Sequence, residues 1–135
     1  MLFQVWTYKG EEFNEPGDNY GFVYIITNLT NDRKYIGKKF FWTTKRKTVN
    51  KKKRKVKVES DWKNYWSSSE ELKKDIKDLG ESNFKREIIH LCKSKGVANY
   101  LEAKEQFLRT VLEDNEKWYN GIINCRVNKT HIKLL

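Results

Sequence analysis

The feature that most restricts the fold is a pair of apolar runs between residues 21 and 38, each of which carries a tyrosine. The first run reads Gly-Phe-Val-Tyr-Ile-Ile-Thr-Asn, and the second reads Lys-Tyr-Ile-Gly-Lys-Lys. Tyr24 and Tyr35 are eleven residues apart. The stretch between the runs is polar and contains Asn31 and Asp32, residue types that favour tight turns. This pattern predicts a β-hairpin with one tyrosine on each strand.

The excess positive charge of the chain is concentrated in one segment. The net charge is +10, and residues 45–57 contain nine Lys or Arg and no acidic residue, so the rest of the chain carries only about +1. A dense basic segment neutralises phosphates and releases counterions, which favours a nucleic acid as its partner. A solvated charged loop and a localisation tract are the alternatives.

Length and composition predict one globular domain over residues 1–135, with 38% hydrophobic and 34% charged residues. No apolar run approaches the roughly 20 residues of a membrane span. The first residues lack the basic and long apolar regions of a secretory signal. We therefore expect a cytoplasmic protein without membrane association, in which Cys92 and Cys125 are reduced thiols.

Two helices are predicted in the second half of the chain. The first covers 69–79, with Ser68 as the N-cap, Glu71 completing a capping box and Gly80 ending the helix. The second covers about 98–112, where apolar residues recur at helical spacing.

The remaining apolar runs predict strands. Strand formers at 2–8 predict a short first strand, and the run at 84–91 predicts a mostly buried one. A short strand or extended segment is expected at 118–124. The expected fold is α+β, a small three-stranded antiparallel sheet flanked by helices, with an extra N-terminal strand and a basic insertion.

The hairpin resembles that of the GIY-YIG nuclease family, with Phe-Val-Tyr at 22–24 in place of Gly-Ile-Tyr and Tyr-Ile-Gly at 35–37. The resemblance continues beyond the hairpin, and the residues that carry it are Leu72, Gly80, Phe84, Ile88, Ile89, Glu105, Leu108, Tyr119 and Asn120. It covers 21–39 and 66–124. Residues 1–20 then form an N-terminal extension and residues 43–61 a basic insertion.

The resemblance implies that Glu105 is the single protein ligand of a divalent metal, Mg²⁺ or Mn²⁺. Independently, Glu105 lies at one-turn spacings from Leu101, Leu108 and Leu112, and a carboxylate among apolar side chains needs a cation. A surface glutamate paired with lysine is the alternative. Glu102, one turn earlier and on a more polar side, is the second candidate.

We assign Tyr24 as the general base, because the resemblance and the neighbouring cation Lys38 support it. The unperturbed pKa of tyrosine is about 10, and a cation close to the hydroxyl would lower it. Tyr35 would orient water or phosphate. Both tyrosines could instead be core residues with satisfied hydroxyls.

The resemblance also implies an arginine that binds the scissile phosphate, eight residues after the glycine and in a helix. That count ends on Lys45, and Arg46 follows it. We choose Arg46 because its planar fork suits a phosphate, with Arg54 as a distant second. Asn120 would position substrate or water. The second-base histidine of some homing members has no counterpart near Trp66, so the chain resembles the lysine-assisted branch or is catalytically weakened.

The basic insertion is the expected DNA-docking element. The cations assigned to DNA are Lys45, Lys47, Lys51, Lys52, Lys53, Arg54, Lys55 and Lys57. The aromatic residues on either side of it are Trp42, Trp62, Tyr65 and Trp66. These aromatics could stack on bases or anchor the insertion to the core.

The sequence therefore predicts a metal-dependent DNA endonuclease that acts on double-stranded DNA, similar to freestanding phage homing endonucleases. The alternative is a nucleic-acid-binding module that keeps the fold without turnover. A basic structural or ribosome-associated protein would explain the lysines but not Glu105. Oligomeric state stays open, a dimer included.

Overall fold

The computed structural model describes residues 5–133 and 135. Its centre is a mixed five-stranded sheet with the strand order β2-β1-β7-β3-β4. The strands of this sheet are β1 (Trp6–Tyr8), β2 (Glu11–Glu12), β3 (Gly21–Asn28), β4 (Arg33–Phe40) and β7 (Phe84–Cys92). Among the helices of the described part of the chain, none is both long and apolar enough to cross a membrane.

The predicted hairpin is confirmed as β3 and β4. The two strands pair antiparallel from Gly21 opposite Phe40 to Asn28 opposite Arg33. In the turn, Asp32 has a φ of 62°, a left-handed conformation that Asp tolerates better than most residues. The β4 strand has β3 on one side only, so it forms an edge of the sheet.

The sheet has five strands, whereas three antiparallel strands and one extra N-terminal strand were expected. β3, β4 and β7 form the predicted antiparallel core, whereas β1 pairs parallel to β7 and β2 adds to β1. The parallel pairing of β1 joins residues about eighty positions apart, which local patterns do not reveal. Of the strand predicted at 2–8, residues 1–4 lie outside the described part. The segment at 118–124 makes one isolated bridge, between Trp118 and Lys34, and is otherwise extended.

Both helices begin at serine caps. α1 (Glu70–Leu79) is capped by Ser69, whose side chain accepts a hydrogen bond from the amide of Leu72, so the cap is Ser69 and not Ser68. Gly80 ends the helix with a φ of 91°. α2 (Lys95–Leu108) begins after Ser94, three residues earlier than predicted, and ends at Leu108 rather than 112.

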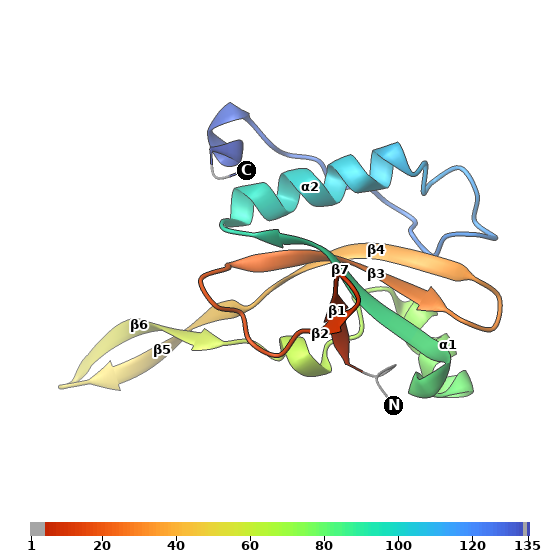
Figure 1. Ribbon diagram of the computed structural model, residues 1–135. Coiled ribbons are helices and arrows are strands. Elements are labelled where there is room, and N and C mark those ends of the chain that lie inside the picture. Colours follow the sequence, from red (N-terminus) through yellow and green to blue (C-terminus); the bar gives the residue numbers. More distant parts are fainter. Residues whose placement is uncertain (1–4, 134) are drawn as a thin grey trace.

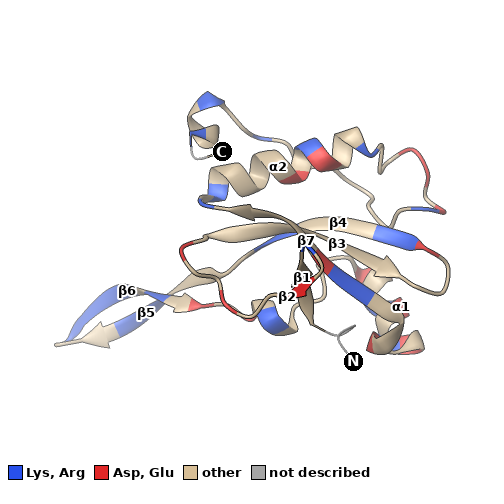
Figure 2. Ribbon diagram, in the orientation of Figure 1, with Lys and Arg blue, Asp and Glu red and all other residues tan. Residues whose placement is uncertain are grey.

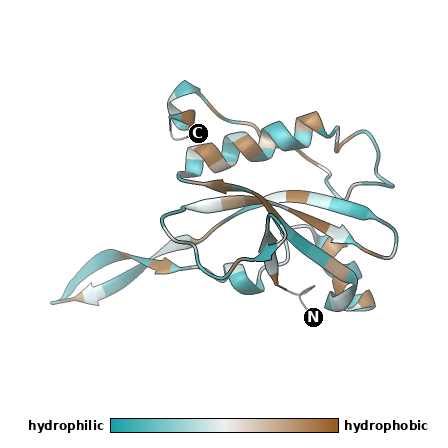
Figure 3. Ribbon diagram, viewed as in Figure 1, coloured by the Kyte–Doolittle hydropathy of each residue, from teal (hydrophilic) through white to brown (hydrophobic). Residues whose placement is uncertain are grey.

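Two hydrophobic layers cover the opposite faces of the sheet (Figures 1 and 3). On one face, Tyr24 and its neighbours pack against α1 and the segment around Trp62. On the other face, Val23 and Ile36 pack against Val97 of α2. Strand alternation sends neighbouring residues of β3 and β4 to opposite layers. At the β4 edge, side chains from both layers come together.

The basic segment folds as a separate two-stranded hairpin, β5 (Trp42–Val49) and β6 (Lys52–Glu59), which projects from the body of the protein (Figure 1). Asn50 and Lys51 form its two-residue loop and have φ values of 52° and 63°. Two consecutive positive φ angles are typical of the type I′ turn that best fits the twist of a hairpin.

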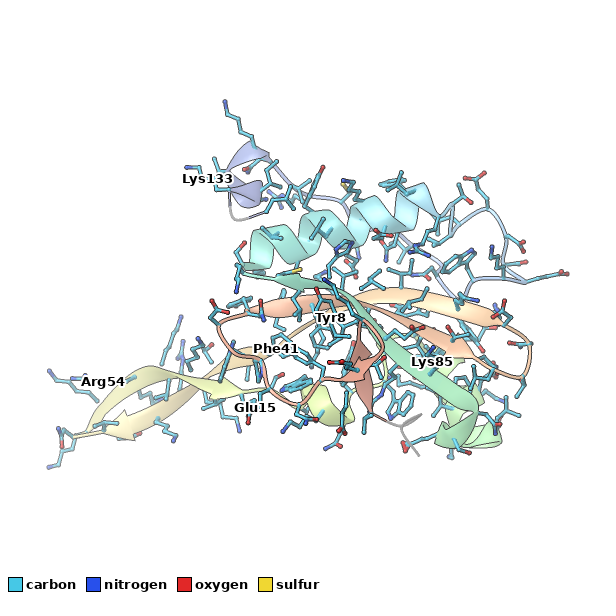
Figure 4. The ribbon with its side chains drawn as sticks, viewed as in Figure 1. Tyr8, Glu15, Phe41, Arg54, Lys85 and Lys133 are labelled. Atoms are coloured by element: carbon cyan, nitrogen blue, oxygen red, sulfur yellow. The ribbon has the colours of Figure 1, made fainter. Side chains whose placement is uncertain are left out.

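Buried aromatic side chains anchor the base of this hairpin. Phe41 and Trp62 are fully buried, and their ring centroids are 4.9 Å apart. The indole of Trp62 donates a 2.7 Å hydrogen bond to the Glu59 carboxylate. Figure 4 shows Phe41 in the body of the protein and Arg54 far out on the hairpin. For Trp62, the anchoring alternative is the one that the structure supports.

Candidate functional site

Tyr24 lies on β3 opposite Gly37 of β4, and the missing side chain of Gly37 gives its ring room. A Cβ on Gly37 would be 2.4 Å from the hydroxyl oxygen of Tyr24 and 2.9 Å from the Cε2 atom of Tyr35. Real Cβ contacts are essentially never that short. The glycine of the second apolar run therefore lets the Tyr24 ring extend across β4 toward the sheet edge.

The Tyr24 side chain is fully buried. Burial raises the pKa of its hydroxyl well above the ordinary value, and the neighbouring Tyr65 and Tyr35, together with a hydrogen bond to Tyr65, raise it further. Tyr24 is therefore a neutral phenol without direct access to solvent water. Burial and these neighbours act against the deprotonation that the predicted role of Tyr24 as a general base requires.

Tyr35 lies closer to the surface than Tyr24. Its hydroxyl is 3.2 Å from the Ser68 hydroxyl, and both residues line a cavity of about 360 Å³ at the edge of β4. Burial also raises the pKa of Tyr35, although the hydrogen bond with Ser68 partly opposes this. Of the two tyrosines, Tyr35 is thus the one that a bound substrate could contact.

The cavity brings together residues from β4, α2, the base of the basic hairpin and the C-terminal segment. Its lining consists of Tyr35, Lys38, Lys39, Phe40, Trp42, Thr43, Ser60, Ser68, Glu102, Gln106, Ile122 and Asn124. Tyrosine and serine hydroxyls, two lysines and one carboxylate give it a polar, mixed-charge character. Such a cavity can hold a phosphate group and a cation together.

Glu102 is the carboxylate of this cavity. Its Oε1 atom accepts a 3.0 Å hydrogen bond from the Lys38 ammonium, and its side chain is only 12% exposed. Its negative charge also contributes to the raised pKa values of Tyr24 and Tyr35. The structure therefore brings Glu102 together with Tyr24, Tyr35 and Lys38. In the sequence, Glu102 was only the second candidate for the metal ligand.

Glu105 lies elsewhere on α2. Its carboxylate is 3.0 Å from His90 Nε2 of β7 and accepts a 2.9 Å bond from Arg109. Burial works against its ionisation, but these hydrogen bonds hold the pKa of Glu105 below its ordinary value. The expected apolar surroundings are wrong too, because Leu108 and Leu112 are 68% and 50% exposed. Glu105 is a satisfied ion-pair residue outside the cavity.

The side chain of Asn120 forms hydrogen bonds with the backbone of β4. Its amide oxygen accepts a 3.0 Å bond from the Ile36 amide, and its amide nitrogen donates a 2.8 Å bond to the Ile36 carbonyl. The side chain is buried and both polar atoms are engaged. Asn120 thus fixes the C-terminal segment against the edge of β4, which differs from the expected contact with substrate or water.

Replacing Asn120 by alanine is expected to lower the free energy of unfolding by about 1–3 kcal/mol, because the buried Ile36 amide would lose its partner and the Ile36 carbonyl would keep only the hydrogen bond from Gln106. Urea unfolding followed by tryptophan fluorescence measures this change. Asn124→Ala is the matched control, since Asn124 is exposed. Equal stabilities of the two variants would show that the Asn120 contacts contribute nothing.

Arg46 lies on β5, opposite Lys55, and its side chain is exposed. Arg46 is in a strand and not in a helix, and it does not line the cavity, so the structure does not bring this predicted phosphate-binding arginine together with Tyr35 and Lys38. Arg54 lies near the tip of the same hairpin.

Inside the cavity, Lys39 provides a cation: its Nζ atom is 2.7 Å from Asp61 and 4.2 Å from the centre of the Tyr65 ring.

Tyr65 lies next to the site and contacts Tyr24, whereas sequence reasoning named it only among the aromatic residues on either side of the basic segment. Its ring meets that of Tyr24 edge-on, with centroids 6.1 Å apart. The segment that carries it is held by Arg86, which donates to the carbonyls of Lys63 and Tyr65 at 3.1 and 2.8 Å. Arg86 is stacked against Trp66 at 4.2 Å. Burial lowers the pKa of the Arg86 guanidinium to about 10.

The family of the chain follows from a comparison with known sequence families. Residues 6–123 match the family described as "Putative endonuclease segE, GIY-YIG domain". Searches of curated proteins and of solved structures gave no match. The match includes the β3–β4 hairpin, the basic hairpin, α1, β7 and α2, and thereby every residue of the cavity except Asn124. The chain therefore belongs to the GIY-YIG endonuclease family.

Proposed function

We propose that the protein is a metal-dependent endonuclease that hydrolyses phosphodiester bonds of double-stranded DNA. The main support is that Tyr35, Lys38 and Glu102 line one cavity at the edge of β4. Phosphodiester hydrolysis needs a group that activates water, positive charge beside the phosphate, and help for the leaving oxygen. A hydroxyl, a cation and a carboxylate that can hold a metal ion fit these needs.

We assign the divalent cation, Mg²⁺ or Mn²⁺, to Glu102 instead of Glu105. Gln106 lies one turn after Glu102 and lines the same cavity, and its amide nitrogen donates to the Ile36 carbonyl at 3.0 Å. Its Oε1 atom is buried without a hydrogen-bond partner among the described residues. Hard cations prefer oxygen ligands and keep several waters, so this pair suits them. A cation bound here would stabilise negative charge on the phosphate and on the leaving oxygen.

We assign the activation of water to Tyr35. As a phenolate, Tyr35 would take a proton from the water whose oxygen attacks phosphorus, and the bond from phosphorus to the leaving sugar oxygen would break. Lys38 and Lys39 would favour the phenolate and bind the non-bridging phosphate oxygens. Lys39 thereby takes the place that the resemblance gave to Arg46. The ring of Tyr24 packs against that of Tyr35, and the ring of Tyr65 packs against that of Tyr24.

Incubation with supercoiled plasmid tests this function. We expect conversion to nicked circles in Mg²⁺ or Mn²⁺ and no conversion in EDTA, because the reaction needs the cation. Gel-shift measurements in EDTA report binding in parallel. If the protein binds DNA but does not cut it with either cation, it is a nucleic-acid-binding module and not a nuclease.

The cleavage rate is expected to rise about tenfold per pH unit between about pH 6 and 9, because the raised pKa of Tyr35 keeps the phenolate scarce there. Single-turnover rates on the plasmid measure this dependence. Tyr35→Phe should lower the rate about 10²–10⁴-fold, the usual contribution of a general base. A wild-type rate that does not change with pH would contradict the role of Tyr35.

A further inference from the structure

The β5–β6 hairpin carries a dense positive charge that the rest of the protein does not neutralise. Lys and Arg follow both of its strands (Figure 2), and nine of them lie between residues 45 and 57. None of the ion pairs between described residues includes one of these nine cations. The hairpin thus presents its positive charge to solvent.

The pairing of the two strands increases the repulsion between these charges. Arg46 lies directly opposite Lys55, and Lys47 lies directly opposite Arg54. Like charges at directly opposite positions destabilise a strand pair. A lone two-stranded hairpin is marginally stable in water even without this repulsion. A polyanion that neutralised the cross-strand pairs would therefore bind and stabilise the hairpin at the same time.

The dimensions of the hairpin match the major groove of B-form DNA. Each strand has eight residues and is about 26 Å long, the length of about eight base pairs of duplex. The major groove is about 12 Å wide and admits a two-stranded ribbon, whereas the minor groove is about 6 Å wide. The major groove of A-form RNA is too narrow and deep for side chains to enter.

The base of the hairpin connects it to the cavity. β5 follows β4 after a single residue, and Trp42, Thr43 and Ser60 line the cavity. The Ser60 amide donates a 2.7 Å hydrogen bond to the Phe41 carbonyl, and its hydroxyl donates a 2.6 Å bond to the Phe40 carbonyl. A duplex held on the hairpin therefore leads to the edge of β4, where Tyr35 and Lys38 line the cavity.

From this arrangement we infer that the β5–β6 hairpin lies in the major groove of B-form duplex DNA and guides the duplex to the cavity. The inference rests on the proposed nuclease function for its biological context. Its test does not require cleavage, because binding is measured in EDTA. A protein that binds as inferred but never cuts would overturn the proposed function and leave this inference intact.

The first test shortens the hairpin without changing its anchor. Replacing residues 44–57 by Asn-Gly joins Thr43 to Val58, which are already opposite each other, through a two-residue loop that suits a type I′ turn. We expect at least a 100-fold weaker affinity for a fluorescein-labelled B-form duplex by anisotropy. Thermal unfolding shows whether the body of the shortened protein is intact, so that a loss of affinity reports on the hairpin alone. Unchanged affinity would overturn the inference.

A charge variant tests the electrostatic part with an unchanged backbone. Lys47→Thr, Lys53→Thr and Lys55→Thr together keep strand-forming residues in β5 and β6. The slope of log affinity against log salt should become shallower by about 0.9 for each phosphate that the variant no longer neutralises. The matched control replaces three exposed α1 lysines, Lys73, Lys74 and Lys77, by alanine and should leave the slope unchanged. Equal slopes in both variants would overturn the inference.

Duplexes with one groove blocked test which groove the hairpin occupies. Bulky groups on the C5 atoms of pyrimidines fill the major groove, and distamycin fills the minor groove. Wild-type affinity should fall at least tenfold with the first and stay unchanged with the second. The shortened protein should not respond to either. Loss of affinity with distamycin alone, or equal affinity for an A-form RNA duplex, would contradict major-groove binding.

Discussion

Glu102→Gln is expected to lower the single-turnover rate of plasmid nicking in Mg²⁺ by about a thousandfold or more, because it removes the only carboxylate among the described residues that line the cavity. The substitution keeps the shape of the side chain and its contact with Lys38, so the fold should be retained. Calorimetric titration with Mn²⁺ gives a second measurement, in which binding should be lost together with cleavage.

Glu105→Gln is the matched control, because it makes the same chemical change on the same helix. It should keep cleavage within a few-fold of the wild type, because the carboxylate of Glu105 contacts His90 and Arg109 and not the cavity. The lowered pKa of Glu105 means that its ion pairs stabilise the folded protein above the unfolded pKa of about 4.3, and this contribution is lost as the pH falls. If Glu105→Gln abolished cleavage and Glu102→Gln did not, the assignment of the metal site would be wrong.

The choice between Glu102 and Glu105 shows where sequence reasoning stops. Glu105 has the spacing to Asn120 that the family resemblance favours, and helical periodicity places it near leucines. Which side of a helix faces the edge of a sheet depends on how the helix is rotated against that sheet. For α2 the rotation is set by Val97, Ala98 and Leu101, which pack on the sheet. The resulting orientation brings Glu102 to Lys38.

Features fixed by neighbours in sequence were predicted well. The hairpin of β3 and β4, the strand β7 and the end of α1 at Gly80 depend on turn residues, alternation and a glycine with positive φ. Features fixed by distant neighbours were missed. The parallel pairing of β1 with β7 and the contact of Tyr65 with Tyr24 depend on residues far apart in the chain.

The basic hairpin was missed for a different reason. Residues 45–57 lack the alternation of apolar and polar residues that indicates a half-buried strand, because neither face of the hairpin is buried. Its loop, Asn50 and Lys51, also lacks the glycine that commonly marks a type I′ turn. Charge density predicts a polyanionic partner for this segment but gives no signal for its secondary structure.

Gly37→Ala is expected to lower the free energy of unfolding by about 1–3 kcal/mol, because the new methyl group would overlap two rings in a packed layer. It would lie 2.4 and 2.6 Å from the hydroxyl oxygen and the Cζ atom of Tyr24, whose ring is fully buried. Tyr35, to which we assign the activation of water, would be displaced as well. Misplacing such a group by about 1 Å can cost about 100-fold in rate. Urea unfolding and single-turnover nicking measure the two effects.

Gly121→Ala is the control for this substitution, since a Cβ on Gly121 would have no atom within 4 Å, and it should change neither measurement. The double variant Tyr24→Phe with Gly37→Ala removes the hydroxyl from the shortest contact and should recover part of the lost stability. That recovery would locate the strain at the Tyr24 hydroxyl. Wild-type stability and rate in Gly37→Ala would instead mean that the close approach of Tyr24 to β4 does not position Tyr35 in the cavity.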